Sequence, residues 1–312
     1  MENIYLKSKG FIDKDTTNYN EISVLFEQIC ESILEKYNIK KKIKILFEDN
    51  KAFGNCATEY PDKISFNKLR YDVIKSLKID CTKNGHLEKL YDFYNHYNEN
   101  CKNSKYKVCL YNFMKKYIGF GLQDYFLQMG SYKTIKYELL ETLFHESQHI
   151  VQEKYKTYIY ENNMKFADEE VLLVFTMLFN EIYNRLIENN IQFNYVRQNY
   201  SFPIEFDARY VALVMSNTLR QKYFIEDILF SQSILNNDIL PKDVSGEKLA
   251  ESIFIDFENL YRLYKSKLGL DLESVFFTIG NYKKKIVSQL TNRYVEMKRI
   301  YLNLKNKLEQ TT

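Results

Sequence analysis

The sequence of 312 residues is 45% hydrophobic and 16% aromatic, which is enough apolar side chain to bury a large core and argues against extended disorder. Its 44 Lys and Arg residues nearly balance its 41 Asp and Glu residues, so the net charge of +3 gives no support to a nucleic-acid or acidic-membrane surface. We therefore expect a folded protein of one sizeable domain or two closely packed ones, with no nucleic-acid partner.

The cysteines and the N-terminal sequence bear on the cellular compartment of the protein. Five cysteines are an odd number, and none belongs to a Cys-x-x-Cys pair, so neither a disulfide framework nor a structural zinc knuckle is indicated. Residues 1–17 lack the apolar core of a secretory signal, and the longest mostly apolar run, 171–179, is too short to cross a bilayer. We expect a cytoplasmic protein without a membrane span, and export by a route without a signal peptide stays open.

Short-range patterns predict a small sheet in the first part of the chain. Apolar residues at helical spacing predict a helix over 21–37, and alternation of apolar residues with mostly Lys predicts a half-buried strand over 43–47. Two further short segments, 52–58 and 63–66, flank the turn residues Tyr60-Pro61-Asp62 and predict a hairpin.

Residues 67–129 carry mostly helical patterns and two histidines, His86 and His96. Each histidine is isolated among charged or aromatic neighbours, and an isolated histidine is seldom a metal ligand. We therefore expect neither to bind a metal.

A helix is predicted from about residue 135 to residue 155, with no Pro or Gly to interrupt it. It contains the sequence His145-Glu146-Ser147-Gln148-His149. Two histidines four positions apart project from one face of a helix, so both imidazoles can bind one metal ion while Glu146 lies beside it. The chain has only 4 histidines, and two of them hold this spacing. The alternative is that both are ordinary surface histidines on an amphipathic helix.

Helices are predicted through the rest of the chain. The pattern over 168–188 is apolar almost all round, which is typical of a helix in the core. A helix over 247–267 is expected to end at Gly269. The last helix, over 282–308, has a heptad seam that we expect to pack on this chain rather than on a partner helix; the seam consists of Leu290, Tyr294, Met297, Tyr301, Leu304 and Leu308.

A catalytic zinc site takes three protein ligands and leaves a position for water, so two histidines are not sufficient. No histidine follows His149 in the sequence, which leaves an Asp or Glu on a later helix. We favour Glu205, because the small residues Ala208 and Ala212 follow it by about one and two turns and let that helix approach the metal helix closely. Asp207 is the rival, and the two carboxylates lie about 200° apart around a helix, so only one can face the metal.

The residues around Glu205 carry a resemblance to known peptidases. The segment Ser201-Phe-Pro-Ile-Glu205-Phe-Asp-Ala208 is similar to the Ser-x-x-x-Glu-x-x-Ala pattern of the CaaX-prenyl and heat-shock membrane peptidases, and to the Pro-x-Glu-x-Asp-Ala pattern of small phage and bacterial zincins. The chain thus resembles a zincin metallopeptidase of the gluzincin type over roughly half its length. It departs from these families at Arg209, where an aspartate is often found, and it lacks the spans of the membrane peptidases.

The resemblance implies a role for each residue of the motif. His145, His149 and Glu205 are expected to bind Zn²⁺, and Glu146 is expected to act as the general base in hydrolysis of a peptide or protein substrate.

The resemblance also implies two further parts of the site. One is an edge strand that pairs with the extended substrate, for which 63–66 is the best candidate. The other is a donor to the tetrahedral oxyanion, which Arg209, Tyr210 or Arg220 can supply; nothing in the sequence selects among them.

The predicted fold class is α+β and mostly helical. We expect a zincin-like protein with a small mixed sheet in an N-terminal lobe over 1–160, a helical C-terminal lobe over 161–312 that carries the third ligand, and an active-site cleft between them. The predicted function is that of a zinc metallopeptidase. The alternatives are a catalytically inactive zincin-fold protein that serves binding or scaffolding, and a coincidental motif. The oligomeric state is not indicated.

Overall fold

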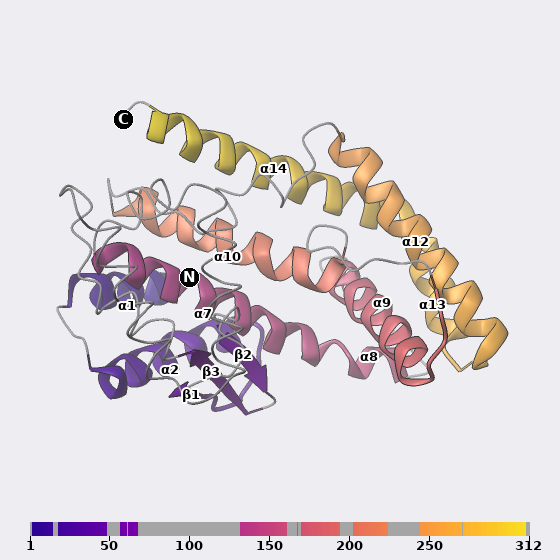
Figure 1. The fold of residues 1–312 in the computed structure, drawn as a ribbon, viewed down its shortest axis with the longest axis horizontal. Helices are drawn as coiled ribbons and strands as arrows, with labels where there is room; N and C mark the ends of the chain where they lie inside the picture. The colour runs from indigo at the N-terminus through magenta and orange to yellow at the C-terminus, as the bar shows by residue number, and fades with distance from the viewer. Residues whose placement is uncertain are drawn as a thin grey trace, which may run out of the picture. The chain divides into compact units, whose positions relative to one another are not determined.

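The computed structural model describes residues 2–14, 18–48, 57–60, 62–67, 132–160, 167, 170–193, 202–223, 244–269 and 271–309. The described chain is mostly helical with one small sheet (Figure 1). It divides into two compact units. The N-terminal unit comprises residues 1–146 and 216–235, and the C-terminal unit comprises residues 147–215 and 236–312.

The N-terminal unit begins with helices α1 (Glu2–Asp13) and α2 (Tyr19–Lys36). Helix α2 confirms the helix predicted over 21–37, and the side chain of Asn18 caps its first turn by accepting a hydrogen bond from the backbone N–H of Asn20 at 3.0 Å. Both helices bury an apolar stripe, and α2 packs on strand β1 (Lys44–Glu48). The strand predicted over 43–47 is thereby confirmed.

Aromatic rings join the two helices to the sheet. The ring of Phe26 on α2 lies 4.8 Å from that of Phe11 on α1 and 5.5 Å from that of Phe66, between ring centroids. Phe66 in turn stacks on Phe47 at 5.1 Å. Such contacts bury large apolar area, and Phe11, Phe26 and Phe66, each 0% exposed, belong to the core of the described part of this unit.

The sheet contains β1, β2 (Ala57–Tyr60) and β3 (Lys63–Asn67) in the order β1-β3-β2. Strands β2 and β3 form the predicted antiparallel hairpin, and β1 pairs with β3 in parallel, so the sheet is mixed as predicted. The expectation that residues 63–66 form an edge strand was wrong. β3 is the central strand and is paired on both sides. β1 precedes the hairpin in the sequence but pairs with β3, the second strand of the hairpin. Local alternation predicts a strand but not its neighbours.

Two long helices follow. Helix α7 (Tyr132–Lys154) and helix α10 (Pro203–Lys222) confirm the predicted helices that carry the histidine motif and Glu205. In the N-terminal unit, the Nζ of Lys136 on α7 donates a hydrogen bond to the carbonyl oxygen of Ile12 at 3.0 Å, which ties α7 to the end of α1. The short helix α8 (Thr157–Tyr160) follows α7.

The C-terminal unit is helical. It contains α9 (Val171–Glu188), α12 (Gly246–Lys267), α13 (Glu273–Asn281) and α14 (Lys283–Glu309). Helix α9 is buried on nearly every side, as its continuous apolar pattern predicts, and α12 packs against both α9 and α14 (Figure 1). The aromatic core of this unit consists of Phe175, Phe179, Phe202, Phe254, Phe257 and Phe276.

The predicted seam of α14 packs within the chain along its first half. Leu290, Tyr294 and Met297 are each at most 3% exposed, and α12 lies against this helix. Tyr301 is partly exposed. Leu290, Tyr294 and Met297 are therefore core contacts, and the side chains of Leu304 and Leu308 lie outside what the structure describes.

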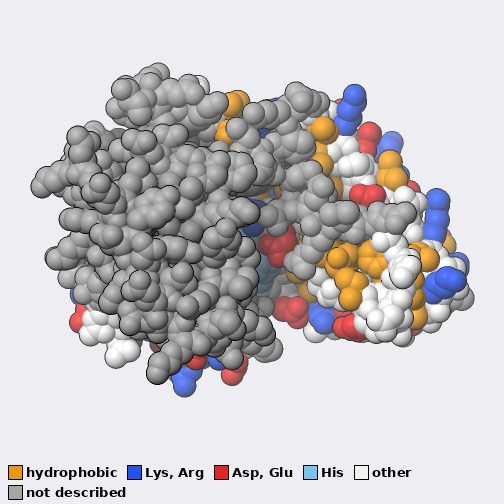
Figure 2. Space-filling model, viewed as in Figure 1, with side chains coloured by type: hydrophobic (Ala, Val, Ile, Leu, Met, Phe, Trp, Pro, Cys, Tyr) orange, Lys and Arg blue, Asp and Glu red, His pale blue; other side chains and the backbone are white. Residues whose placement is uncertain are grey.

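Several expectations lie outside the described residues. They are the helical pattern from 68 to 129, with His86 and His96, and the start of the hairpin at 52–56. Within the described ranges, no helix is both long and apolar enough to cross a bilayer. Basic and acidic side chains are interspersed over the described part of the face shown in Figure 2, in keeping with the near balance of charges in the sequence.

A close approach at Gly246 sets the distance between α12 and α14. A Cβ added at this glycine would lie 2.9 Å from Cδ1 of Tyr294 and 3.3 Å from the carbonyl oxygen of Thr291. The ring of Tyr294 cannot easily move, because it is 2% exposed and its hydroxyl donates to the carbonyl oxygen of Val244 at 3.2 Å. Only glycine therefore fits at this helix crossing.

We predict that Gly246→Ala destabilises the protein by about 1–3 kcal/mol, because the added methyl group forces α12 and α14 apart. Gly280→Ala is the matched control, since nothing lies within 4 Å of a Cβ at that helical glycine, and it should stabilise by up to about 1 kcal/mol. Urea unfolding followed by circular dichroism measures both changes. Equal stability of the Gly246→Ala variant and the parent would contradict the close approach.

Candidate metal centre

Helix α7 places its two histidines on the only accessible stripe of a buried segment. From residue 139 to residue 152, every side chain is buried except Glu141, His145 and His149, which are four positions apart. Residues at this spacing lie above one another on one face of a helix. The histidines are therefore not on a broad solvent-facing side of an amphipathic helix, and both imidazoles can be reached from the same direction.

Helix α10 brings a carboxylate to this stripe from its first turn. Pro203 opens the helix, where its missing N–H costs no hydrogen bond, and Glu205 lies in the same turn, where a negative charge is favourable. The start of α10 is attached to α7 in the C-terminal unit, because the side-chain amide of Gln152 donates to the carbonyl oxygen of Ile204 at 3.0 Å. Ala208 and Ala212 are buried, at 0% and 2% exposure.

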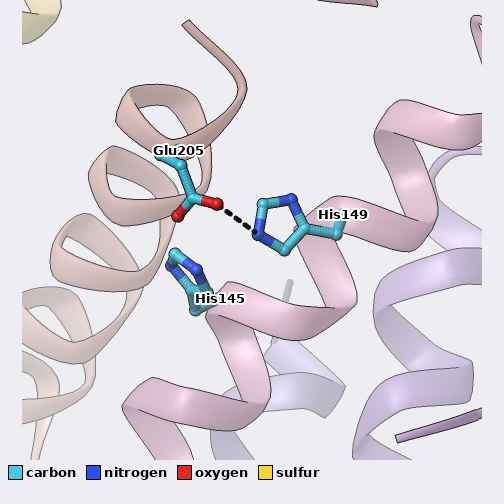
Figure 3. Close-up of side chains that lie close together, drawn as sticks. All are labelled: His145, His149 and Glu205. Atoms are coloured by element: carbon cyan, nitrogen blue, oxygen red, sulfur yellow. Dashed lines mark ion pairs between the residues drawn. The ribbon is translucent and has the colours of Figure 1, made fainter. Parts of the chain in front are cut away.

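The side chains of His145, His149 and Glu205 converge (Figure 3). One candidate ligand atom from each lies within 4.8 Å of the other two, and Nε2 of His149 is 4.0 Å from Oε1 of Glu205. Ligand atoms around a tetrahedral zinc ion are about 3.3 Å apart, given bonds of about 2.0–2.1 Å. Small side-chain rotations would close the difference. This is the one group of three metal-ligand side chains within the described parts of the chain, and its residues fit a single ion.

Glu146 follows His145 directly and is 9% exposed. It is about 100° further round α7 than His145, next to the stripe that carries the two imidazoles. Glu146 is therefore shielded from bulk water and is the sequence neighbour of a candidate ligand, as expected of a general base at such a site.

The rival ligand Asp207 takes no part in the cluster. Its side chain is 1% exposed and forms an ion pair with Arg293 on α14 through Oδ1. Its Oδ2 accepts hydrogen bonds from the side-chain amides of Gln148 and Gln152, each at 2.7 Å. Asp207 is thus a buried, paired carboxylate and not a member of the three-residue cluster.

The candidate oxyanion donors differ in their surroundings. The hydroxyl of Tyr210 donates to Glu296 on α14 at 2.6 Å. Burial raises the pKa of Tyr210, and the carboxylate of Glu296 raises it further. The guanidinium of Arg293 lies 4.7 Å from the centre of the Tyr210 ring. Tyr210 thus faces α14 in the described structure.

The two arginines are placed differently. Arg209 is one turn beyond Glu205, and its Nε is buried with no hydrogen-bond partner among the described residues. Arg220 is 6% exposed, and its Nη2 donates to the side-chain oxygen of Asn217 at 2.8 Å. The role of each as an oxyanion donor stays a prediction.

Sequence reasoning missed Gln152 and Arg293. Nδ1 of His149 is 2.8 Å from Oε1 of Gln152, whose side chain is fully buried. A signal was available for Gln152, since it is a polar residue on the buried side of the metal helix, three positions after a candidate ligand. No local pattern marks Arg293, which lies far along the chain.

We found no match to this chain among protein-family models, curated proteins or solved structures. The centre is therefore defined by its own geometry, as a cluster of two histidines and a glutamate that can hold a metal ion.

We predict that Glu205→Ala weakens zinc binding by well over about tenfold, because it removes one of three ligands. Asp207→Asn leaves all three ligands but disturbs the contacts that hold Gln152, so we expect a smaller loss of zinc affinity than for Glu205→Ala. Titration of both variants against a chromogenic chelator measures the two affinities. The opposite order would move the third ligand to Asp207.

Proposed function

We propose that this protein is a zinc-dependent metallopeptidase that acts on a peptide or protein substrate in the cytoplasm. The observation that carries the proposal is the convergence of His145, His149 and Glu205. Glu146, which directly follows His145 in the sequence, is buried. Two imidazoles and one carboxylate are a donor set of catalytic zinc sites in hydrolases, and they leave a coordination position open.

Each residue of the proposed site would have a separate role. The two imidazoles and Glu205 would hold the ion, and a zinc ion in such a site supplies an activated water and a Lewis acid for the scissile carbonyl. The carboxylate of Glu146 would accept the proton of the attacking water and deliver it to the leaving amine. Its burial limits competition from bulk water for that proton.

The sheet and the candidate oxyanion donors bear on how a substrate would be positioned. β3 already pairs with β1 and β2, so addition of an extended substrate to residues 63–66 is not part of it. Arg209 supports the proposal as the candidate oxyanion donor, because helix geometry places it one turn from Glu205 and its Nε has no hydrogen-bond partner among the described residues. The polar contact of Tyr210 with Glu296 makes Tyr210 a weaker candidate.

We expect the protein purified without chelator to contain about one zinc ion per chain, as three protein ligands from one cluster imply. Elemental analysis by mass spectrometry measures the content. The double variant His145→Ala and His149→Ala is the control and should contain none. Absence of a stoichiometric transition metal from the parent, even after zinc loading, would refute the metal site and leave the motif a coincidence.

Replacement of Glu146 by Gln separates catalysis from metal binding. The amide is nearly the same size but cannot accept a proton, so Glu146→Gln should keep its zinc and lose hydrolysis by about 100-fold or more. Cleavage of a fluorogenic peptide library and elemental analysis of the same samples measure the two properties. Parental cleavage rates in this variant would contradict the role of Glu146. A parent that holds zinc but cleaves nothing would favour the alternative, an inactive zincin-fold binding or scaffold protein.

A further inference from the structure

A chain of buried polar side chains lies behind His149, entirely within the C-terminal unit. Nδ1 of His149 is hydrogen-bonded to Oε1 of Gln152 at 2.8 Å. The Nε2 of Gln152 donates to Oδ2 of Asp207 at 2.7 Å, and Oδ1 of Asp207 is paired with Arg293. Gln152 is 0% exposed and Asp207 is 1% exposed, so water does not compete for these contacts.

The partners of Gln152 determine the orientation of its amide. One end of the side chain faces the carboxylate of Asp207 and the backbone carbonyl oxygen of Ile204, at 2.7 Å and 3.0 Å. Both partners are acceptors only, so this end must be the NH₂ group. The carbonyl oxygen of the amide is then the group that faces His149.

The amide orientation in turn selects the tautomer of His149. The carbonyl oxygen of Gln152 can only accept a hydrogen bond, so the nitrogen that faces it, Nδ1, must carry the proton. In the neutral ring, Nε2 then has the lone pair. Nε2 is the atom that lies 4.0 Å from Glu205, on the side of the metal cluster.

Asp207 and Arg293 hold the amide in place. The carboxylate of Asp207 also accepts a hydrogen bond from Gln148, one turn before Gln152 on α7, at 2.7 Å. A buried carboxylate needs a compensating charge, and Arg293 provides it from α14. Rotation of the Gln152 amide would bring its oxygen against the Asp207 carboxylate and the carbonyl oxygen of Ile204, and each acceptor would lose one donor, which a buried site does not tolerate.

We propose that Gln152, held by Asp207 and Arg293, is a positioning residue that keeps His149 in the Nδ1–H tautomer with Nε2 presented to the metal. This inference rests on the metal site of the proposed function, but it does not require that the site hydrolyse anything. At many metal sites a single carboxylate or carbonyl group orients the ligating histidine. Here the amide of Gln152 and the carboxylate of Asp207, on another helix, would do so together.

The tautomer can be observed directly in the metal-free protein. Long-range ¹H–¹⁵N correlation spectra, recorded at a pH where the imidazole is neutral, distinguish a protonated Nδ1 from a protonated Nε2. The parent should show His149 as the Nδ1–H form. Gln152→Met removes the acceptor and should shift His149 towards the Nε2–H form or a mixture.

Two further variants control for structural damage. Gln148→Met removes a neighbouring amide that binds Asp207 and leaves the contact between Gln152 and His149 in place, so the tautomer should not change. Gln152→Glu in its protonated form keeps an acceptor oxygen towards Nδ1–H and a donor towards Asp207, so it should keep the Nδ1–H form even where stability falls. Circular dichroism confirms that each variant is folded.

Zinc affinity gives a second readout. Gln152→Met should bind zinc about 10- to 100-fold more weakly than the parent, the usual cost of losing the partner of a ligating histidine. A Gln152→Met protein with the parental tautomer and parental zinc affinity would overturn the inference, as would an Nε2–H parent. Failure of the proposed function would look different: a parent that binds zinc and does not cleave peptides leaves the tautomer result intact.

Discussion

The buried carboxylate of Asp207 is the constraint on which the candidate site depends. A carboxylate that is 1% exposed requires both a counter-charge and hydrogen-bond donors, and these come from Arg293 on α14 and from Gln148 and Gln152 on α7. The first turn of α10 is thereby held against α7 at one rotation. That rotation directs Glu205, about 200° away around α10, to the side where His149 lies.

The packing of the C-terminal unit supports this arrangement. Arg293 can reach Asp207 only if α14 keeps its place, and α14 is held by its contact with α12, where Gly246 allows the ring of Tyr294 to lie directly on the helix start. Arg293 and Tyr294 are neighbours on α14, so one short segment serves both the core and the polar network. A change in core packing at Gly246 is therefore expected to affect the metal site through Arg293.

Helix α7 shows how a site is kept accessible within a core element. Between residues 139 and 152 it is buried except for one stripe, and that stripe carries Glu141, His145 and His149. Glu146, next to His145 in the sequence, is 9% exposed, which would suit the general base of the proposed function. The polar residues on the buried side, Gln148 and Gln152, both bind Asp207, and Gln152 also contacts His149.

Local sequence determined the helices and the candidate ligands, because helical periodicity and the spacing of His145 and His149 depend only on residues within a few turns. The same reasoning separated Glu205 from Asp207 by their angle around a helix. Tertiary structure alone decided three things. Strand β3 is central rather than at the edge, because strand order depends on which distant segment pairs with it. Asp207 is buried rather than exposed, because Arg293, far along the chain, supplies its counter-charge. Gln152 faces His149 because the acceptors at its other end come from α10. Pairing between distant segments leaves no periodic trace in the sequence, whereas a spacing of four residues on one helix does.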